Sequence, residues 1–251
     1  MKKIFLMMIA GMMALTSCVV TTTKEEGQAK RQVDVPVFEK IEIIGSPTVS
    51  YAQGDSVSVY VEGALEDVTR LEAKVHGNVL HVSLKDEGLL KNMLHGSVGK
   101  LTVHVTSPDL IGVTLTGSGD FISRQPLDTD NMDIVLRGSG EIKFASIICD
   151  RIKAELEGSG DIDLNGVQTQ DAHLSVLGSG DMDVRLQRVP KATISLVGSG
   201  DIDVGFDECG TANCQLTGSG DIELKGSLRQ LNKNKSGSGD IETKHLTVKN
   251  R

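Results

Sequence analysis

The residues best placed to do chemistry are carboxylates that return at a fixed spacing in the second half of the 251-residue chain. A Gly-Ser-Gly-acid tetrapeptide begins at Gly117, and the spacings to its further copies are 21, 20, 20, 20, 20 and 19 residues. A second acid follows two positions later in five of the copies. The first set is Asp120, Glu141, Asp161, Asp181, Asp201, Asp221 and Asp240, and the second set is Asp163, Asp183, Asp203, Glu223 and Glu242.

These carboxylates form charged columns if successive copies lie on stacked strands. Like charges about 4.8 Å apart repel by roughly 0.9 kcal/mol per neighbouring pair in water, so another interaction must offset the repulsion. The favoured interpretation is that backbone N–H groups at the corner donate hydrogen bonds to the first set, as they do to Asp in turns. A second interpretation is binding of a divalent cation, with Ca²⁺ preferred because it takes many oxygen ligands; the candidate ligands are Asp161, Asp163, Asp181, Asp183, Asp201, Asp203, Asp221 and Glu223. A third is docking of a basic partner.

No residue pattern in the sequence points to catalysis as clearly as the repeated carboxylates point to a charged surface. The six histidines share no repeat position and show no His-x-x-x-His spacing of metal ligands. No repeated serine has a histidine at a matching position, and the chain has no phosphate loop or nucleotide fingerprint. We therefore predict a protein that is not an enzyme and needs no cofactor. A β-helix polysaccharide lyase is the enzymatic alternative, but the sequence shows no cluster of basic and acidic residues for the elimination.

The same period carries the apolar residues that must position these acids. Apolar residues directly follow the acid and recur two positions on, as in Ile162 and Leu164, and two more precede each Gly-Ser-Gly, as in Ala154 and Leu156. This alternation describes strands with one buried face. Two strands joined at a glycine corner cannot close a core alone, whereas stacked coils can. Residues 111–251 are thus predicted to form an all-β parallel solenoid with coils of about 20 residues. An antiparallel sandwich is the alternative, although it does not require a constant period.

Two regions depart from the regular repeat. In the seventh period Lys233 and Lys235 occupy positions that are apolar earlier, which predicts a polar capping coil at the C-terminal end. Residues 33–110 lack the tetrapeptide but keep the alternation, which predicts less regular coils that are continuous with the repeats. Within them, Lys85–Lys100 is predicted as an excursion loop with a helical turn at Leu89–Leu94.

The N-terminus predicts export. Two lysines precede an apolar run of about a dozen residues, and the small residues after it complete a secretory signal over 1–17. The segment Leu15-Thr16-Ser17-Cys18 resembles the lipobox of bacterial lipoproteins, in which the cysteine is acylated; an ordinary cleaved signal is the alternative. More than one acyl chain gives stable anchoring. Residues 18–32 are polar and predict a flexible tether between the lipid and the folded body.

Composition narrows the choice of partner. Without the two signal-peptide lysines the chain has 24 basic against 34 acidic residues, which argues against nucleic acid because binding there needs a basic face. Trp is absent and Tyr51 and Tyr60 are the only tyrosines, which disfavours a carbohydrate cleft in the second half without excluding one. Cys209 and Cys214 are close enough in sequence for a bridge in an oxidising compartment, and free buried thiols are the favoured alternative.

Residues 33–248 as a whole resemble a family called putative auto-transporter adhesin, head GIN domain. The resemblance rests on the Gly-Ser-Gly-Asp repeats and on two N-terminal motifs, Phe38-x-x-Ile41-x-Ile43 and Gln53-Gly54-Asp55 followed by Val57 and Val59. The resemblance implies a right-handed β-helix and, by name, adhesion. It carries over no catalytic residues.

We therefore expect an exported, lipid-anchored scaffold of the cell envelope, held at the periplasmic face of the outer membrane or at the cell surface. Its solenoid faces would bind a polysaccharide or a protein, and the exposed flanks would also suit a homo-oligomer. The alternative is a periplasmic structural or Ca²⁺-binding protein.

Overall fold

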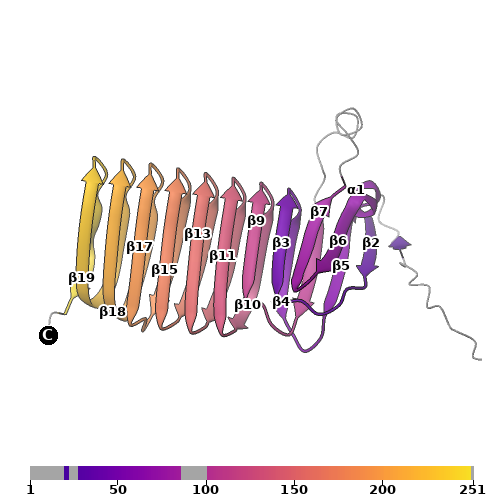
Figure 1. The fold of residues 1–251 in the computed structure, drawn as a ribbon, viewed down its shortest axis with the longest axis horizontal. Coiled ribbons are helices and arrows are strands. Elements are labelled where there is room, and N and C mark those ends of the chain that lie inside the picture. The colour runs from indigo at the N-terminus through magenta and orange to yellow at the C-terminus, as the bar shows by residue number, and fades with distance from the viewer. Residues whose placement is uncertain (1–19, 23–27, 86–100, 250–251) are drawn as a thin grey trace, which may run out of the picture.

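A computed structural model describes residues 20–22, 28–85 and 101–249. The predicted signal peptide, Cys18, and the predicted helical turn at Leu89–Leu94 with nearly all of its loop lie outside the described residues. Within them lie twenty strands and one short helix, joined in a single sheet network. The molecule is an elongated solenoid with an irregular N-terminal end (Figure 1). The prediction of an all-β parallel solenoid is therefore confirmed.

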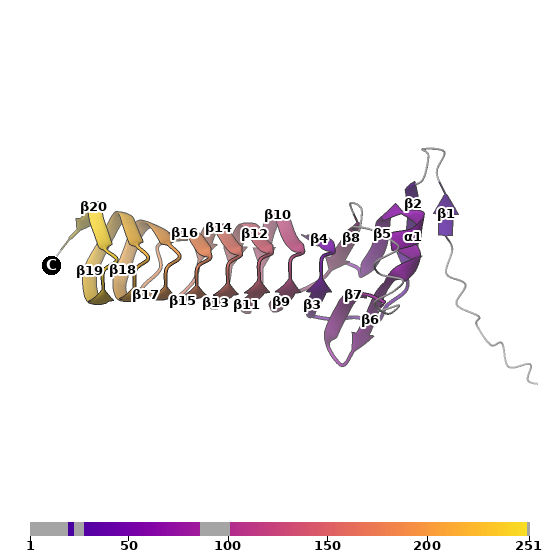
Figure 2. The same cartoon turned by 90° about the horizontal axis from the view of Figure 1, so that it is seen from above.

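The repeat region consists of two ladders of parallel strands, one before and one after each Gly-Ser-Gly corner. Seen from above, the two ladders lie on opposite sides of the solenoid (Figure 2). Ladder A contains β9 (Gly112–Gly117), β11 (Asn131–Gly138), β13 (Arg151–Gly158), β15 (Asp171–Gly178), β17 (Lys191–Gly198) and the second halves of β18 (Ile202–Gly218) and β19 (Ile222–Gly237). Ladder B contains β10 (Asp120–Asp128), β12 (Glu141–Ile148), β14 (Asp161–Gln168), β16 (Asp181–Gln187), the first halves of β18 and β19, and β20 (Ile241–Val248).

Residues one sequence period apart lie opposite each other in the ladders. In ladder A, Leu136 lies opposite Leu115 on one side and Leu156 on the other, so equivalent residues stack. The inward side chains of both ladders form one buried apolar cluster along the solenoid. Because each apolar column packs on its own kind in the next coil, the core is assembled between coils rather than within one.

The corner glycines are required by the stacking. At Gly138 the φ angle is +129°, and an added Cβ would lie 2.2 Å from the carbonyl oxygen of Gly117 in the preceding coil. The next residue, Ser139, donates its backbone N–H to that same oxygen at 2.9 Å. The corner therefore combines a left-handed backbone with a direct backbone contact, and only glycine satisfies both.

The first coil of the solenoid lies earlier in the chain than the tetrapeptide predicts. Strands β3 (Lys40–Gly45) and β4 (Thr48–Gln53) stack on β9 and β10, with Gly45 opposite Gly117. On their other side they pair in parallel with β7 (Val79–Leu84) and β8 (Thr102–Ser107). The coils are thus one stack, but not in chain order, because the first coil lies between the second and the third.

The N-terminal end is closed by strands that change direction. Strand β5 (Ser58–Ala64) pairs antiparallel with β8, β6 (Leu71–His76) pairs antiparallel with β7, and the helix α1 (Leu65–Arg70) joins them. Strand β2 (Gln28–Val33) pairs antiparallel with β5, buries Ala29 and pairs with the short β1 (Val20–Thr22). The tether predicted over 18–32 is therefore too long, because β2 supplies β5 with its second hydrogen-bonded neighbour.

A polar coil caps the apolar core at the C-terminal end, as predicted. Lys233 lies opposite Cys214 and Lys235 lies opposite Leu216, so both occupy positions that are apolar in the preceding coil. Residues 232–238 are all exposed. The last coil therefore ends the apolar columns with a polar layer.

Candidate binding surface

Ladder B carries both acidic columns on its outward face. Asp161 lies opposite Asp181 and Asp163 opposite Asp183, and the second column continues through Asp203. Their apolar neighbours on the same strands point inward and are buried, which is the alternation that the sequence predicts. The register thus turns a linear repeat into two rows of carboxylates on one side of the solenoid.

Backbone hydrogen bonds hold part of the first column. The N–H of Asp201 donates to Oδ1 of Asp181 at 3.0 Å, that of Asp221 to Oδ1 of Asp201 at 2.9 Å, and that of Asp240 to Oδ1 of Asp221 at 2.7 Å. For these three carboxylates the predicted hydrogen bond from a corner N–H is confirmed, and its donor belongs to the next coil. In an earlier coil, Asp161 instead donates its N–H to the carbonyl of Gly140 at 3.0 Å.

Lysines offset part of the charge in both columns. Lys225 lies 2.9 Å from Glu223 and 3.7 Å from Asp203, measured from its Nζ to a carboxylate oxygen. Lys143 pairs with Glu141 at 2.8 Å in the same way. The hydrogen bond from Lys225 lowers the pKa of Glu223. The acidic face is therefore interrupted by cations at both ends of its middle section.

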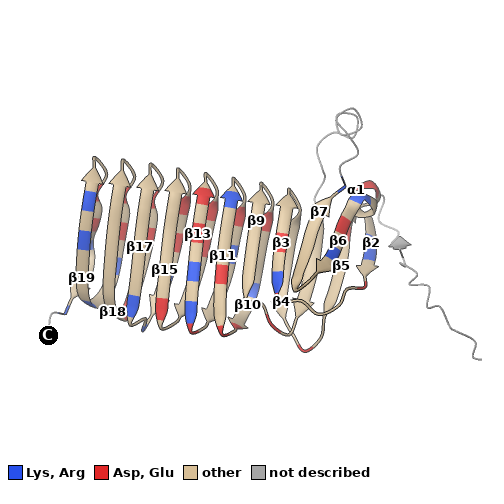
Figure 3. Ribbon diagram, in the orientation of Figure 1, with Lys and Arg blue, Asp and Glu red and all other residues tan. Residues whose placement is uncertain are grey.

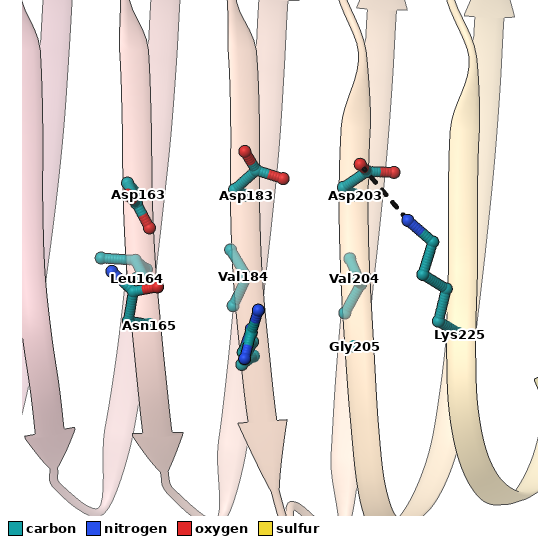
Figure 4. A pocket seen from close by; sticks show the side chains of 10 residues that line it. Asp163, Leu164, Asn165, Asp183, Val184, Asp203, Val204, Gly205 and Lys225 are labelled. Carbon is teal, nitrogen blue, oxygen red and sulfur yellow. Dashed lines mark ion pairs between the residues drawn. The ribbon is translucent and has the colours of Figure 1, made fainter.

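A shallow groove lies over that middle section (Figure 4). Its volume is about 240 Å³, and three carboxylates and one ammonium group line it together with Asn165, Arg185 and parts of the strands. Partial desolvation, followed by the charge of Asp163, raises the pKa of Asp183. Desolvation also raises the pKa of Asp203, although Lys225 opposes the shift. The groove thus holds carboxylates that are mutually repelled and only partly compensated. Its lining carboxylates are Asp163, Asp183 and Asp203.

The candidate Ca²⁺ ligands all lie on this face, but their carboxylates are divided among other roles. Those of Asp181, Asp201 and Asp221 accept backbone hydrogen bonds, and that of Glu223 pairs with Lys225. Across residues 20–22, 28–85 and 101–249, no group of three or more His, Cys, Asp or Glu residues is arranged to hold a metal ion. Cation binding stays a prediction that no contact in the described residues supports.

The cysteines of the solenoid are free and buried. Cys209 and Cys214 both lie in β18, five residues apart, which is about 16 Å along an extended strand and too far for a disulfide. The bridge that the sequence left open is therefore excluded by the fold. Burial raises the pKa of Cys214 to about 12, and it also raises the pKa values of Cys149 and Cys209. These thiols act as small apolar side chains of the core.

The histidines of the N-terminal end form surface pairs that the sequence did not predict. His81 lies 2.5 Å from Glu42, and its ring is 5.6 Å from that of His76 across the β6–β7 pair. His104 stacks on Tyr60 at a ring distance of 4.4 Å. Antiparallel pairing brings His76 to His81 and Tyr60 to His104, and parallel pairing of β3 with β7 brings Glu42 to His81, so no spacing along the chain could have revealed these contacts.

The fold and this surface define a class of protein: a β-solenoid with a long, flat, charged face and a closed, apolar interior. The chain belongs to the family "Putative auto-transporter adhesin, head GIN domain", whose model matches residues 37–208 and 188–251. No curated protein gives a significant match.

Solved structures with the same fold come from bacteria. The chain is similar to a putative adhesin from Bacteroides fragilis, with 25% identity, a TM-score of 0.74, and coverage of 86% of this chain and 96% of the other. It is also similar to a putative adhesin from Parabacteroides distasonis, with 17% identity, a TM-score of 0.71, and coverage of 88% and 98%. A putative lipid binding protein from the same species matches with 19% identity, a TM-score of 0.66, and coverage of 87% and 98%. The last two establish the fold alone.

Proposed function

We propose that this protein is a non-enzymatic binding scaffold of the cell envelope, exported and held at a membrane by acyl chains on Cys18. The observation that carries the binding role is the continuous outward face of ladder B, on which side chains of one kind repeat from coil to coil. A repeated face suits a partner that is itself extended, because each coil adds a similar contact. Membership of an adhesin family supports the same role.

The anchor is supported by the N-terminal sequence. The lipobox-like segment Leu15-Thr16-Ser17-Cys18 follows the apolar run, and β2, the first strand to pair with β5, begins ten residues after Cys18. Within the described residues, no helix is long and apolar enough to cross a membrane. Acyl chains on Cys18 would hold the solenoid at the bilayer while leaving its flanks accessible.

The anchor is tested by labelling cells with an alkyne analogue of palmitate. The intact chain should incorporate the label and remain with the membrane fraction, whereas Cys18→Ala should lose both properties. Cys149→Ala is the matched control, because it removes a buried cysteine and should keep the label. Label that persists in Cys18→Ala would contradict the proposal.

The side of the membrane requires a second measurement. Protease treatment of intact cells, followed by a blot against this protein and a periplasmic control, separates the two locations. Loss of the solenoid while the control survives supports adhesion at the cell surface. Protection of the solenoid overturns that role and favours a structural partner inside the envelope.

A further inference from the structure

The C-terminal end of the solenoid presents an open strand edge. The second half of β19 pairs on one side with β18, and no strand of the described residues pairs with its other side. Residues 232–238 are exposed, so the backbone groups of this edge are accessible. An edge of this kind is a template for one further strand.

The side chains beside this edge select what can be added. A further strand would lay alternate side chains over Lys233 and Lys235, at the end of the buried columns. Lys235 is paired with Asp240 of its own coil at 2.7 Å, and Lys233 has no ion pair among the described residues. An apolar strand would desolvate the ammonium group of Lys233 without compensation and would cover the Lys235–Asp240 pair, whereas carboxylates at alternate positions would pair with Lys233 and lie beside Lys235.

The net charge of the repeat region changes from negative to positive toward the C-terminal end. Residues 225–251 contain seven Lys and Arg against two acids, whereas residues 120–224 contain eight against nineteen. Figure 3 shows basic residues on β19, whereas earlier strands such as β11 and β13 carry both signs. Lys249 and Arg229 line a small cavity at the second corner of the same end. The last coil is therefore a basic end on an acidic body.

We propose that the edge of β19 binds an extended acidic peptide, which adds as a strand and places carboxylates at alternate positions over Lys233 and Lys235. An anionic polysaccharide would match the charge but lacks the regularly spaced amide N–H and C=O groups that continue a strand ladder, so the observations favour a peptide. The inference goes beyond the proposed binding role, because it places a second binding site at the edge of β19, apart from the outward face of ladder B, and names the partner class of that edge. Its test uses purified protein, so its failure would leave the anchor and the location untouched.

The test is a fluorescence anisotropy titration of the full chain with a labelled peptide of alternating valine and aspartate. Binding is expected for this peptide, and little or none for a peptide with lysine in place of aspartate. An N-methylated version, whose backbone cannot pair with the edge, should lose binding while keeping its charge. Equal binding of the methylated peptide would overturn strand addition, and no binding of the aspartate peptide would leave the lysines as a cap only.

Two double variants locate the site. Lys233→Gln with Lys235→Gln keeps a polar cap and should weaken binding about tenfold, because two exposed ion pairs are lost. Lys153→Gln with Lys191→Gln removes the same charge from the outward face of ladder A and should leave binding within about twofold. Equal weakening by the two double variants would assign the binding to net charge and overturn the site.

Discussion

The regular coils and the N-terminal end of this molecule both bury apolar strand faces, but the coils use parallel strand pairing and the N-terminal end uses antiparallel pairing. In the coils the strands run parallel to their neighbours, with register shifts in ladder B, and the corner backbones touch, as at Gly138 and Gly117. At the N-terminal end β5 and β6 run antiparallel to β8 and β7, and the turn at Gly77 leaves open space around its backbone. Repetition therefore gives tightly constrained corners and identical columns, while reversal of strand direction gives looser turns and an end that is covered.

The largest expected effect comes from breaking the close corner of the coils. Gly138→Ala places a Cβ 2.2 Å from the carbonyl oxygen of Gly117 at a φ of +129°. Strain and overlap together should lower the free energy of unfolding by about 3–5 kcal/mol. The midpoint of urea unfolding measures this loss.

Gly77→Ala is the matched control at the N-terminal end. Its φ is +62° and an added Cβ meets nothing within 4 Å. Only the left-handed backbone is penalised, so the expected loss is about 1 kcal/mol. Equal losses at the two glycines would show that the close contact between coils does not govern stability.

The same contrast decides what the sequence could predict. The coils were predictable because the glycine corner appears seven times and the apolar pair before it six times, so the apolar columns, the corners and the cap at Lys233 and Lys235 follow from periodicity. The coil of β3 and β4 falls within residues 33–110, where irregular coils were predicted, but its corner was not identified because it reads Gly45-Ser46-Pro47-Thr48, with proline and threonine in place of glycine and acid. Its position between later coils could not be predicted, because stacking order depends on contacts distant in the chain.

The candidate surface was predictable in part for the same reason. The strand register predicted from the repeat places the two acidic columns. Which carboxylate accepts a backbone N–H and which pairs with a lysine depends on local geometry. Asp181 accepts an N–H from the next coil, while Lys225 extends along the face to Glu223 and Asp203. A repeat motif specifies which side chains are equivalent, and departures from the motif, such as Lys225, determine how they differ.

A smaller effect should follow from altering how the C-terminal end is closed. Lys233→Ile with Lys235→Leu restores the apolar side chains of earlier coils and leaves them without a cover. Exposed apolar columns beside an open edge should drive association, so sedimentation should shift to larger species as concentration rises. Unchanged sedimentation would mean that the lysines are not what keeps this end from associating.

Lys233→Gln with Lys235→Gln serves as the control for that experiment. It removes the charge but leaves a polar layer over the core, so its sedimentation should match that of the unaltered chain. Association of this variant would assign the protective effect to charge rather than to polarity. The N-terminal end needs no such layer, because β5 buries Val59 and Val61 against its neighbours.

The smallest expected effect concerns the like charges that repetition brings together. Partial desolvation and Asp163 raise the pKa of Asp183 above its usual 3.8, so its ionised form opposes folding above that raised value. The opposition is relieved as the pH falls through the folded-state pKa, and it is absent below 3.8. Asp183→Asn should therefore raise the thermal midpoint at pH 7 by about 1 °C, and the midpoints of the variant and the unaltered chain should converge in acid.

Glu223→Gln should instead lower the thermal midpoint at pH 7. Lys225 lowers the pKa of Glu223, so the stability that the ionised Glu223 contributes is lost as the pH falls. If both variants shift the thermal midpoint in the same direction at pH 7, repulsion at Asp183 and pairing at Glu223 do not affect stability in opposite ways, and this prediction is wrong.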